Sequence, residues 1–206
     1  MERLISLSKE KYSTVLTGAG FMMYEFKQIV SLQLKGYSNE EIRIKVIDEN
    51  LFQYNKLASL KRSFPYLLTR VDTLDDHLKQ MVHTEELRTV KIINLYTIMK
   101  TDQLFFEFMS EVIGEKLQHP GDALERKEVN LFFANKAEQS VFIHNLAEST
   151  VKRLQSAFLK ILLEVDILMD LKARELRRPL IDDQLKEYLI KIGDAVYVKA
   201  MGEYEG

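Results

Sequence analysis

Apolar residues recur at helical spacing through residues 141–179, the stretch most informative about this chain. Val151, Leu154, Phe158 and Leu162 follow one another at intervals of three, four and four. Such spacing puts them on one side of a helix. We expect this helix to begin near Ser149, where the Ser149 and Thr150 side chains can accept hydrogen bonds from free N–H groups of the first turn. We also expect it to run on into residues 162–168.

The opposite side of this helix is basic, because it carries Lys152 and Arg153. A second basic cluster follows the apolar run and is closed by Pro179; it contains Lys172, Arg174, Arg177 and Arg178. A basic helix, a short apolar run and a basic segment together outline a winged helix-turn-helix, whose second helix enters the major groove of DNA. The alternative is an amphipathic helix followed by a solvated charged loop.

A second helix-turn-helix candidate lies nearer the start of the chain. Ser38 and Glu41 form a capping-box pattern at the start of a short helix. Residues 48–50 then make a turn, and residues 55–70 contain no acid. The basic residues Lys56, Lys61 and Arg62 lie in this stretch. Because proline disrupts helix interiors, we expect this helix to end near residue 63 and another to begin at Pro65. A solvated basic face is the alternative interpretation.

The remaining segments also show helical period, and the chain holds only eight glycines and three prolines. We therefore predict an all-α fold, a compact multi-helix bundle that contains two helix-turn-helix-like units, of which either could carry a wing. The further expected helices span residues 21–35, 65–78, 85–100, 102–117 and 185–193. Because residues 102–117 are apolar on most sides, we expect this helix to be the central buried one.

The loop at residues 119–122 suggests a division of the chain. We expect a helical domain at 1–118, containing the first helix-turn-helix-like unit. A second helical domain at 119–206 would contain the winged unit and pack tightly on the first.

Composition limits the function classes. Net charge is −2 over 206 residues, so binding to nucleic acid would require local basic patches. Residues 12–24 form the longest run without a charged residue or histidine, thirteen residues, whereas a membrane-spanning helix needs about 20. Acidic residues within 1–11 argue against a signal peptide. Together with the absence of cysteine, this predicts a cytoplasmic protein without membrane contact.

The sequence offers no recognisable catalytic chemistry. The Gly18–Ala19–Gly20 run lacks the third glycine of a dinucleotide site, and the position where it would fall is Met23. The four histidines have no metal-ligand spacing with one another or with carboxylates. We therefore predict no metal, no cofactor, no small-molecule substrate and no enzymatic activity.

Several short stretches, in this order and spacing, carry a family resemblance. They are YST at 12–14, TGA at 17–19, KGYSNEEIR at 35–43, NLFQ at 50–53, KR at 61–62, FFEFMSEV at 105–112, VNLFF at 129–133 and STVKRL at 149–154. The chain resembles the BrxA family of BREX phage-exclusion systems, which distinguish host DNA from phage DNA by methylation. The resemblance implies an all-helical, cytoplasmic, non-enzymatic accessory protein that binds double-stranded DNA. It also admits other BREX proteins as partners.

One feature departs from a standard winged helix. No Asn-Gly or Asp-Gly hairpin signal follows Leu168. The wing is therefore a longer loop or helix, or it is absent, which weakens the assignment of Arg174, Arg177 and Arg178 as phosphate contacts.

Three functional hypotheses follow. In the first, the chain binds DNA with little sequence specificity, mainly through phosphates. The contacts would be Lys56, Lys61, Arg62, Lys152 and Arg153, joined by Arg174, Arg177 and Arg178, with Ser149 and Thr150 able to reach a phosphate or a base edge. In the second, the chain is a protein-interaction adaptor without DNA contact. An unrecognised enzyme is the weakest hypothesis. The DNA hypothesis requires these cations to gather on one surface.

Overall fold

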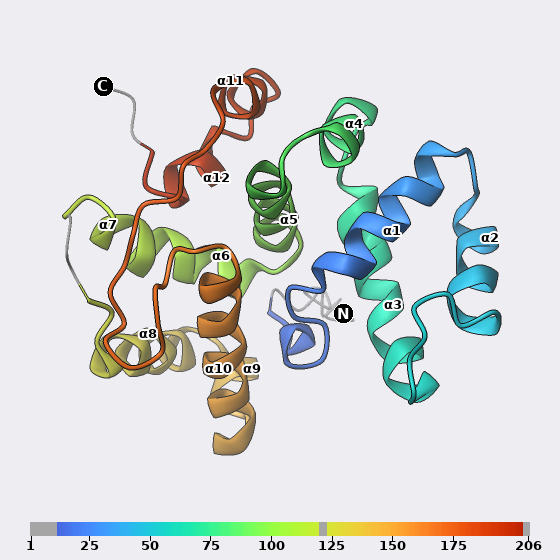
Figure 1. Ribbon diagram of the computed structural model, residues 1–206. Helices are drawn as coiled ribbons and strands as arrows, with labels where there is room; N and C mark the ends of the chain where they lie inside the picture. Colours follow the sequence, from blue (N-terminus) through green and yellow to red (C-terminus); the bar gives the residue numbers. More distant parts are fainter. Residues whose placement is uncertain (1–11, 120–122, 204–206) are drawn as a thin grey trace, which may run out of the picture.

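The computed structural model describes residues 12–119 and 123–203, and it confirms the all-α prediction (Figure 1). Within these residues, extended structure is limited to two isolated antiparallel bridges, Ala123 with Glu175 and Leu168 with Leu176. The N-terminal elements are η1 (Val15–Thr17), α1 (Met23–Leu34), α2 (Asn39–Arg43), the π-helical turn η2 (Ile44–Asp48), α3 (Leu57–Asp72) and α4 (Asp76–Thr84). They are followed by α5 (Leu87–Thr101), α6 (Gln103–Phe108), the π-helical turn η3 (Met109–Ile113), α7 (Gly114–Lys116), α8 (Arg126–Gln139), α9 (Val141–His144), α10 (Glu148–Glu164), α11 (Asp183–Lys191) and α12 (Ala195–Ala200).

The central position belongs to α5, which corrects the prediction that residues 102–117 form the central helix. Ten of the fifteen residues of α5 are buried, so the helix is enclosed on nearly all sides. It packs against α1, α3 and α4 on one side and against α6 and α12 on the other (Figure 1). The segment α6–η3–α7 is one continuous helical stretch that contacts α5 through α6; most of its apolar side chains are buried, but Ser110, Glu111 and Glu115 are exposed. Both helices are apolar around most of their circumference, so sequence pattern alone could not rank them.

In the helix-turn-helix candidate nearer the start of the chain, the basic helix is longer than expected. Instead of ending near residue 63, α3 continues through Pro65 to Asp72, while the expected helix 65–78 is divided between α3 and α4. Leu60, Phe64 and Leu67 are buried at spacings of four and three on both sides of the proline. This continuous apolar face packs against α1 and α5. Burial of the face offsets the one backbone hydrogen bond that proline cannot make.

The ends of the neighbouring helices follow the sequence closely. Ser38 and Glu41 form the predicted capping box, in which the Ser38 N–H donates to the Glu41 carboxylate at 2.8 Å. Gly36 follows the end of α1 with a φ of +85°, a conformation that glycine adopts without steric cost. The end of α1 and the turn into α2 are therefore determined locally.

A cluster of phenylalanines joins α6, α8 and α10. In the contacting pairs of this cluster, the ring centroids lie 5.0–5.6 Å apart; the members are Phe105, Phe108, Phe132, Phe133 and Phe158. Such contacts add to the free energy of area burial. The two predicted domains, 1–118 and 119–206, thus contribute to a shared core, and the position of their boundary stays a prediction.

The segment after α10 corrects a further expectation. The helix ends at Glu164 rather than continuing to Leu168, and Asp166 has a φ of +60°. The chain then folds back on itself: the Met169 N–H donates to the Glu175 carbonyl at 3.0 Å, and the Arg177 N–H donates to the Ile167 carbonyl at 2.8 Å. This paired loop occupies the place where the sequence left the presence of a wing open.

None of the helices in the described part of the chain is long and apolar enough to cross a membrane.

Candidate nucleic-acid interface

The predicted cations of the first unit lie on the outer face of α3. Lys61 and Arg62 are exposed, whereas the adjacent Leu60 and Ser63 are buried. Lys56, which precedes the first residue of the helix, is exposed as well. Within the described residues none of these three side chains has an acidic partner within 4.0 Å, so their charges face solvent.

The start of α10 differs from the prediction. The N-cap is Ala147, one residue before Glu148, and no side chain caps this end. Ser149 and Thr150 are therefore inside the first turn, and the expectation that they cap the helix is wrong. Ser149 is exposed and Thr150 half-buried. Glu148 is the first residue of α10, and its carboxylate interacts favourably with the positive end of the helix dipole.

The two cations next to each other in α10 have different surroundings. The Lys152 Nζ lies 2.6 Å from a Glu148 carboxylate oxygen, one turn earlier. The hydrogen bond from Lys152, together with the attraction between the two charges, lowers the pKa of Glu148. Arg153 has no such partner within the described residues and lines a cleft beside η1. Of these two cations, only Arg153 therefore presents an uncompensated charge.

The three arginines after α10 also differ from one another. The Arg178 guanidinium donates to the Leu117 carbonyl at 3.1 Å, which fixes the loop against α7. Arg174 is half-buried with a φ of +56°, and its carbonyl accepts from the Leu124 N–H at 2.8 Å. Arg177 is exposed and lines a cavity of about 280 Å³ together with Arg88 and Lys91 of α5.

The cations thus form more than one group. In Figure 1, α3 and α10 both begin at the lower edge of the molecule, with η1 between them, and the loop after α10 runs on the α7 and α8 side of α10, away from α3. The structure orients the starts of the two basic helices toward the same end of the molecule. It separates the Arg174, Arg177 and Arg178 group from α3.

Residues that the sequence did not assign to DNA contact line the cleft beside Arg153 and extend its surface. Ser156, Ala157 and Lys160 line the same cleft as Arg153, as do Gly18 and Gly20 of the N-terminal loop. The helical residues were detectable, because positions 153, 156, 157 and 160 share one face of a helix. The facing glycine loop was not, because nothing in the sequence pairs residues about 130 positions apart.

Two further cations, Arg70 and Lys136, are buried. Arg70, in the acid-free stretch of α3, is 2% exposed and donates to the Ala19 and Gly20 carbonyls. Burial lowers its pKa to about 10, partly opposed by Asp102, so it stays charged at neutral pH. The Lys136 Nζ lies 2.7 Å from a carboxylate oxygen of Glu107 and 2.7 Å from one of Glu111. Burial by itself would lower the pKa of Lys136, but the two carboxylates outweigh it and raise the pKa. Neither side chain is available to a ligand.

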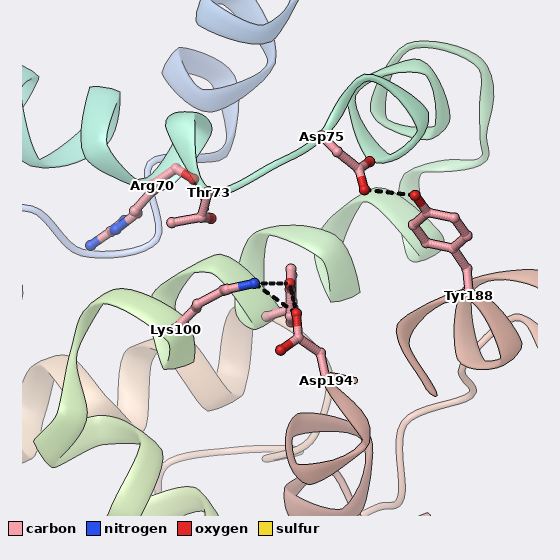
Figure 2. A network of polar contacts seen from close by, with 7 residues as sticks. Arg70, Thr73, Asp75, Lys100, Tyr188 and Asp194 are labelled. Atoms are coloured by element: carbon pink, nitrogen blue, oxygen red, sulfur yellow. Dashed lines mark hydrogen bonds and ion pairs between the residues drawn. The ribbon is translucent and has the colours of Figure 1, made fainter. Parts of the chain in front are cut away.

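A polar network holds the C-terminal helices in place. Figure 2 shows the Lys100 ammonium of α5 beside the Asp194 carboxylate, at 2.6 Å, and the Tyr188 hydroxyl of α11 donating to Asp75 at 2.6 Å. The Tyr96 hydroxyl also donates to Asp194, at 2.5 Å. The pKa of Tyr96 is raised mainly by burial and also by this hydrogen bond. These groups satisfy one another, so the network is an interhelical clamp that docks α11 and α12 on α4 and α5.

The match to a family model covers residues 10–193, nearly all of the chain. This chain belongs to the BrxA family. A "BREX protein BrxA" from Bacillus cereus (strain H3081.97) is 33% identical over 193 residues, which cover 93% of this chain and 96% of that protein. A second "BREX protein BrxA", from Paramagnetospirillum magneticum (strain ATCC 700264 / AMB-1), is 21% identical over 183 residues, 89% of this chain and 92% of that protein. The predicted membership of the BrxA family is confirmed.

A crystal structure shares the fold of this BrxA-family chain. It is that of an uncharacterized protein from Magnetospirillum magneticum, which superposes with a TM-score of 0.82 at 20% sequence identity and covers 93% of this chain and 98% of that one. At this identity the similarity concerns the fold alone.

Proposed function

We propose that this chain is the BrxA component of a BREX phage-defence system and binds double-stranded DNA in the cytoplasm without catalysing a reaction. Phosphates supply most of the contacts, and sequence preference is weak. The observation that carries the proposal is the outer face of α3 with the preceding Lys56: Lys56, Lys61 and Arg62 are exposed, and none has an acidic partner within 4.0 Å among the described residues. Because the whole chain has a net charge of −2, this local concentration of positive charge decides where a polyanion would bind.

The arrangement of elements supports a helix-turn-helix-like role for two segments. In the first, α2 and η2 precede α3. In the second, α8 and α9 precede α10, and the paired loop of residues 167–177 follows it as a wing would. In helix-turn-helix proteins the second helix lies in the major groove while flanking parts contact the backbone. On this basis α3 and α10 are the helices that approach DNA.

The test is a titration of the intact chain on random-sequence duplex DNA at two salt concentrations. Each phosphate that the protein neutralises releases counterions, so log K should fall linearly with log salt, with a slope of about −0.9 per contact. Reversing the charges of Lys61 and Arg62 should weaken binding on every duplex sequence tested. Absence of binding at low salt, or affinity that does not change with salt, would refute the proposal.

A protein-interaction adaptor is the second candidate, and one observation favours it. A groove of about 350 Å³ on α11 and α12 is lined by exposed apolar side chains, among them Ile190 and Val196. Exposed apolar patches frequently mark contacts with other proteins. If Lys61→Glu/Arg62→Glu leaves DNA retention unchanged but removes binding of another BREX protein, the adaptor hypothesis replaces the DNA hypothesis.

A further inference from the structure

A cleft of about 440 Å³ separates the N-terminal glycine loop from α10. One wall consists of Gly18, Gly20, Phe21 and Met22, and the other is a face of α10. The walls come from opposite ends of the sequence, and η1 packs against α10 at their side. The cleft is open to solvent and runs along α10 from Arg153, in the second turn, to Glu164, the last residue of the helix. Only its Arg153 end lies near the start of α10 that the proposed function directs at DNA.

The α10 wall is cationic. Arg153 and Lys160 are seven residues apart, about 10 Å along the helix axis, and Ser156 and Ala157 lie between them on the same face. Both cations are exposed, and within the described residues neither has an acidic partner within 4.0 Å. Small side chains between them leave the helix surface accessible. Among the described lining residues, Glu164 is the one carboxylate, and it lies at the far end of the stripe.

The backbone N–H groups of the loop wall point away from two buried side chains, Arg70 and Asn94. From inside, Arg70 donates to the Ala19 carbonyl and, at 2.5 Å, to the Gly20 carbonyl, while the Asn94 amide donates to the Phe21 carbonyl at 2.7 Å. In a trans peptide the C=O of one residue and the N–H of the next point in opposite directions. The N–H groups of residues 20, 21 and 22 therefore point away from Arg70 and Asn94, neither of which lines the cleft.

These N–H groups have no acceptor among the described residues. They lead into α1, whose first turn also lacks a side-chain cap. Unpaired N–H groups at such a place favour an anion. The cleft therefore combines two uncompensated cations on one wall with a row of oriented N–H donors on the other.

Gly20 is not required by the fold of the loop itself. Its φ lies outside the left-handed region, and a Cβ built on it would meet no atom within 4 Å. A larger residue could occupy this position in the free protein. Glycine there does allow a ligand to approach the backbone closely, which is a recurrent use of this residue at phosphate sites.

We propose that this cleft binds a phosphate group, held by Arg153 and Lys160 on one side and by the N–H groups of residues 20–22 on the other. The inference rests on the proposed function, in which the phosphate belongs to the DNA backbone. A phosphate oxyanion matches both walls, because a guanidinium and an ammonium supply charge and backbone N–H groups supply directed hydrogen bonds. The buried Arg70 acts as a positioning residue that orients those N–H groups.

The first experiment compares Lys160→Ala with Lys191→Ala in the full chain. Lys191 is an exposed lysine on α11, outside the cleft, and serves as the matched control. At about 0.1 M salt, removing one phosphate-binding cation should weaken DNA binding roughly 8-fold and reduce the salt slope by about 0.9. Lys191→Ala should leave both unchanged. Equal behaviour of the two variants, with wild-type protein binding DNA normally, would overturn the cleft while leaving the proposed function intact.

A pair of substitutions at Gly20 distinguishes the effect of a negative charge on DNA binding from the effect of side-chain size. Gly20→Asn and Gly20→Asp add side chains of the same size, and the open space around this position accommodates both. The aspartate should weaken DNA binding several-fold more than the asparagine, because its carboxylate repels a bound phosphate. Thermal unfolding of both variants checks that the fold is kept. Equal affinities of two folded variants would contradict the proposal.

Titration with inorganic phosphate, followed by amide chemical shifts, distinguishes the source of the ligand. The signals of residues 20–22 should move in the wild-type protein and remain still in Lys160→Ala. If they move although the wild-type protein does not bind DNA, the cleft holds a free phosphate compound and the proposed function alone is wrong. If they do not move with either inorganic phosphate or DNA, the site is refuted.

Discussion

The two basic helices α3 and α10 reach the same end of the molecule with different surroundings. On α3, Lys61 and Arg62 are exposed, and neither has an acidic partner within 4.0 Å in the described part of the chain. On α10, Glu148 forms an ion pair with Lys152, and Arg153 instead faces the glycine loop across a cleft. The α3 surface is therefore an open basic face, whereas α10 contributes its cations to one wall of a cleft whose other wall is the glycine loop.

This difference indicates that the two helices would use different means to hold a phosphate. An open basic face acts by charge alone and is sensitive to salt. A cleft whose second wall carries backbone N–H groups adds directed hydrogen bonds. Arg70 connects the two regions, because it stands near the end of α3 and holds the loop that faces α10.

The largest expected effect comes from removing that connection. Arg70→Ala leaves the Ala19 and Gly20 carbonyls without their buried donor, which should lower the free energy of unfolding by about 3 kcal/mol. Denaturant unfolding measures this. Arg62→Ala, an exposed arginine on the same helix, is the control and should change stability by no more than about 0.5 kcal/mol. Similar values for the two variants would show that the loop does not depend on Arg70.

Charge reversal of Lys61 and Arg62 should break the open basic face. Because it removes two phosphate-binding cations and adds repulsion, DNA affinity should fall roughly 100-fold at about 0.1 M salt, with little change in stability. The same reversal at Arg177 and Arg178 should weaken binding less, since Arg178 is partly engaged with the Leu117 carbonyl. A larger decrease from the second pair, measured on the same duplex, would move the interface to the other side of α10.

The difference within α10 is tested by single alanine substitutions. Arg153→Ala should weaken DNA binding roughly 8-fold and lower the salt slope by the equivalent of about one phosphate. Lys152→Ala should have a smaller effect on the slope, because its ammonium is already paired with Glu148 at 2.6 Å. Glu148→Gln should strengthen binding by releasing Lys152. Equal slopes for the two alanine variants would mean that the ion pair opens when DNA binds.

The smallest effect is expected at Asp75, which belongs to the clamp and follows the end of α3, at the other end of that helix from Lys61 and Arg62. Burial alone would raise the pKa of Asp75, but hydrogen bonds from the Leu78 N–H and the Tyr188 hydroxyl hold it below its ordinary value of 3.8. Because the folded pKa is depressed, the stabilisation is present above that ordinary value and is lost as pH falls through the folded pKa. Asp75→Ala should thus cost about 1 kcal/mol at neutral pH.

Unfolding of Asp75→Ala and wild-type protein at a series of pH values checks this sign. The difference between them should shrink as the pH falls below 3.8, and DNA affinity at neutral pH should not change. A difference that grows with acidity would contradict the assigned hydrogen bonds.

The sequence predicted most helices because apolar spacing is a local property. The inner face of α10 and the capping box at Ser38 each depend on residues within about one or two turns of one another. Family membership was also accessible, since it depends on the order of short motifs along the chain. Pro65 was misjudged because the free energy that keeps α3 continuous comes from packing on α1 and α5.

The candidate site was only half visible in the sequence. The cations were identified, but composition could not say which of them are paired: Lys152 joins Glu148, Arg178 reaches the Leu117 carbonyl, and Arg70 is buried. The cap assigned to Ser149 and Thr150 failed for a similar reason, because a residue can lie inside the first turn or before it without a change in the apolar pattern.

By itself, the sequence determined an all-helical chain, its family and the positions of its basic helices, because period, capping and motif order act over short distances along the backbone. Only the tertiary structure decided which charges remain available and what they face. The glycine loop and α10 are about 130 residues apart, and burial of a common core brings them together. That approach is what converts Arg153, one cation among many, into part of a defined cleft.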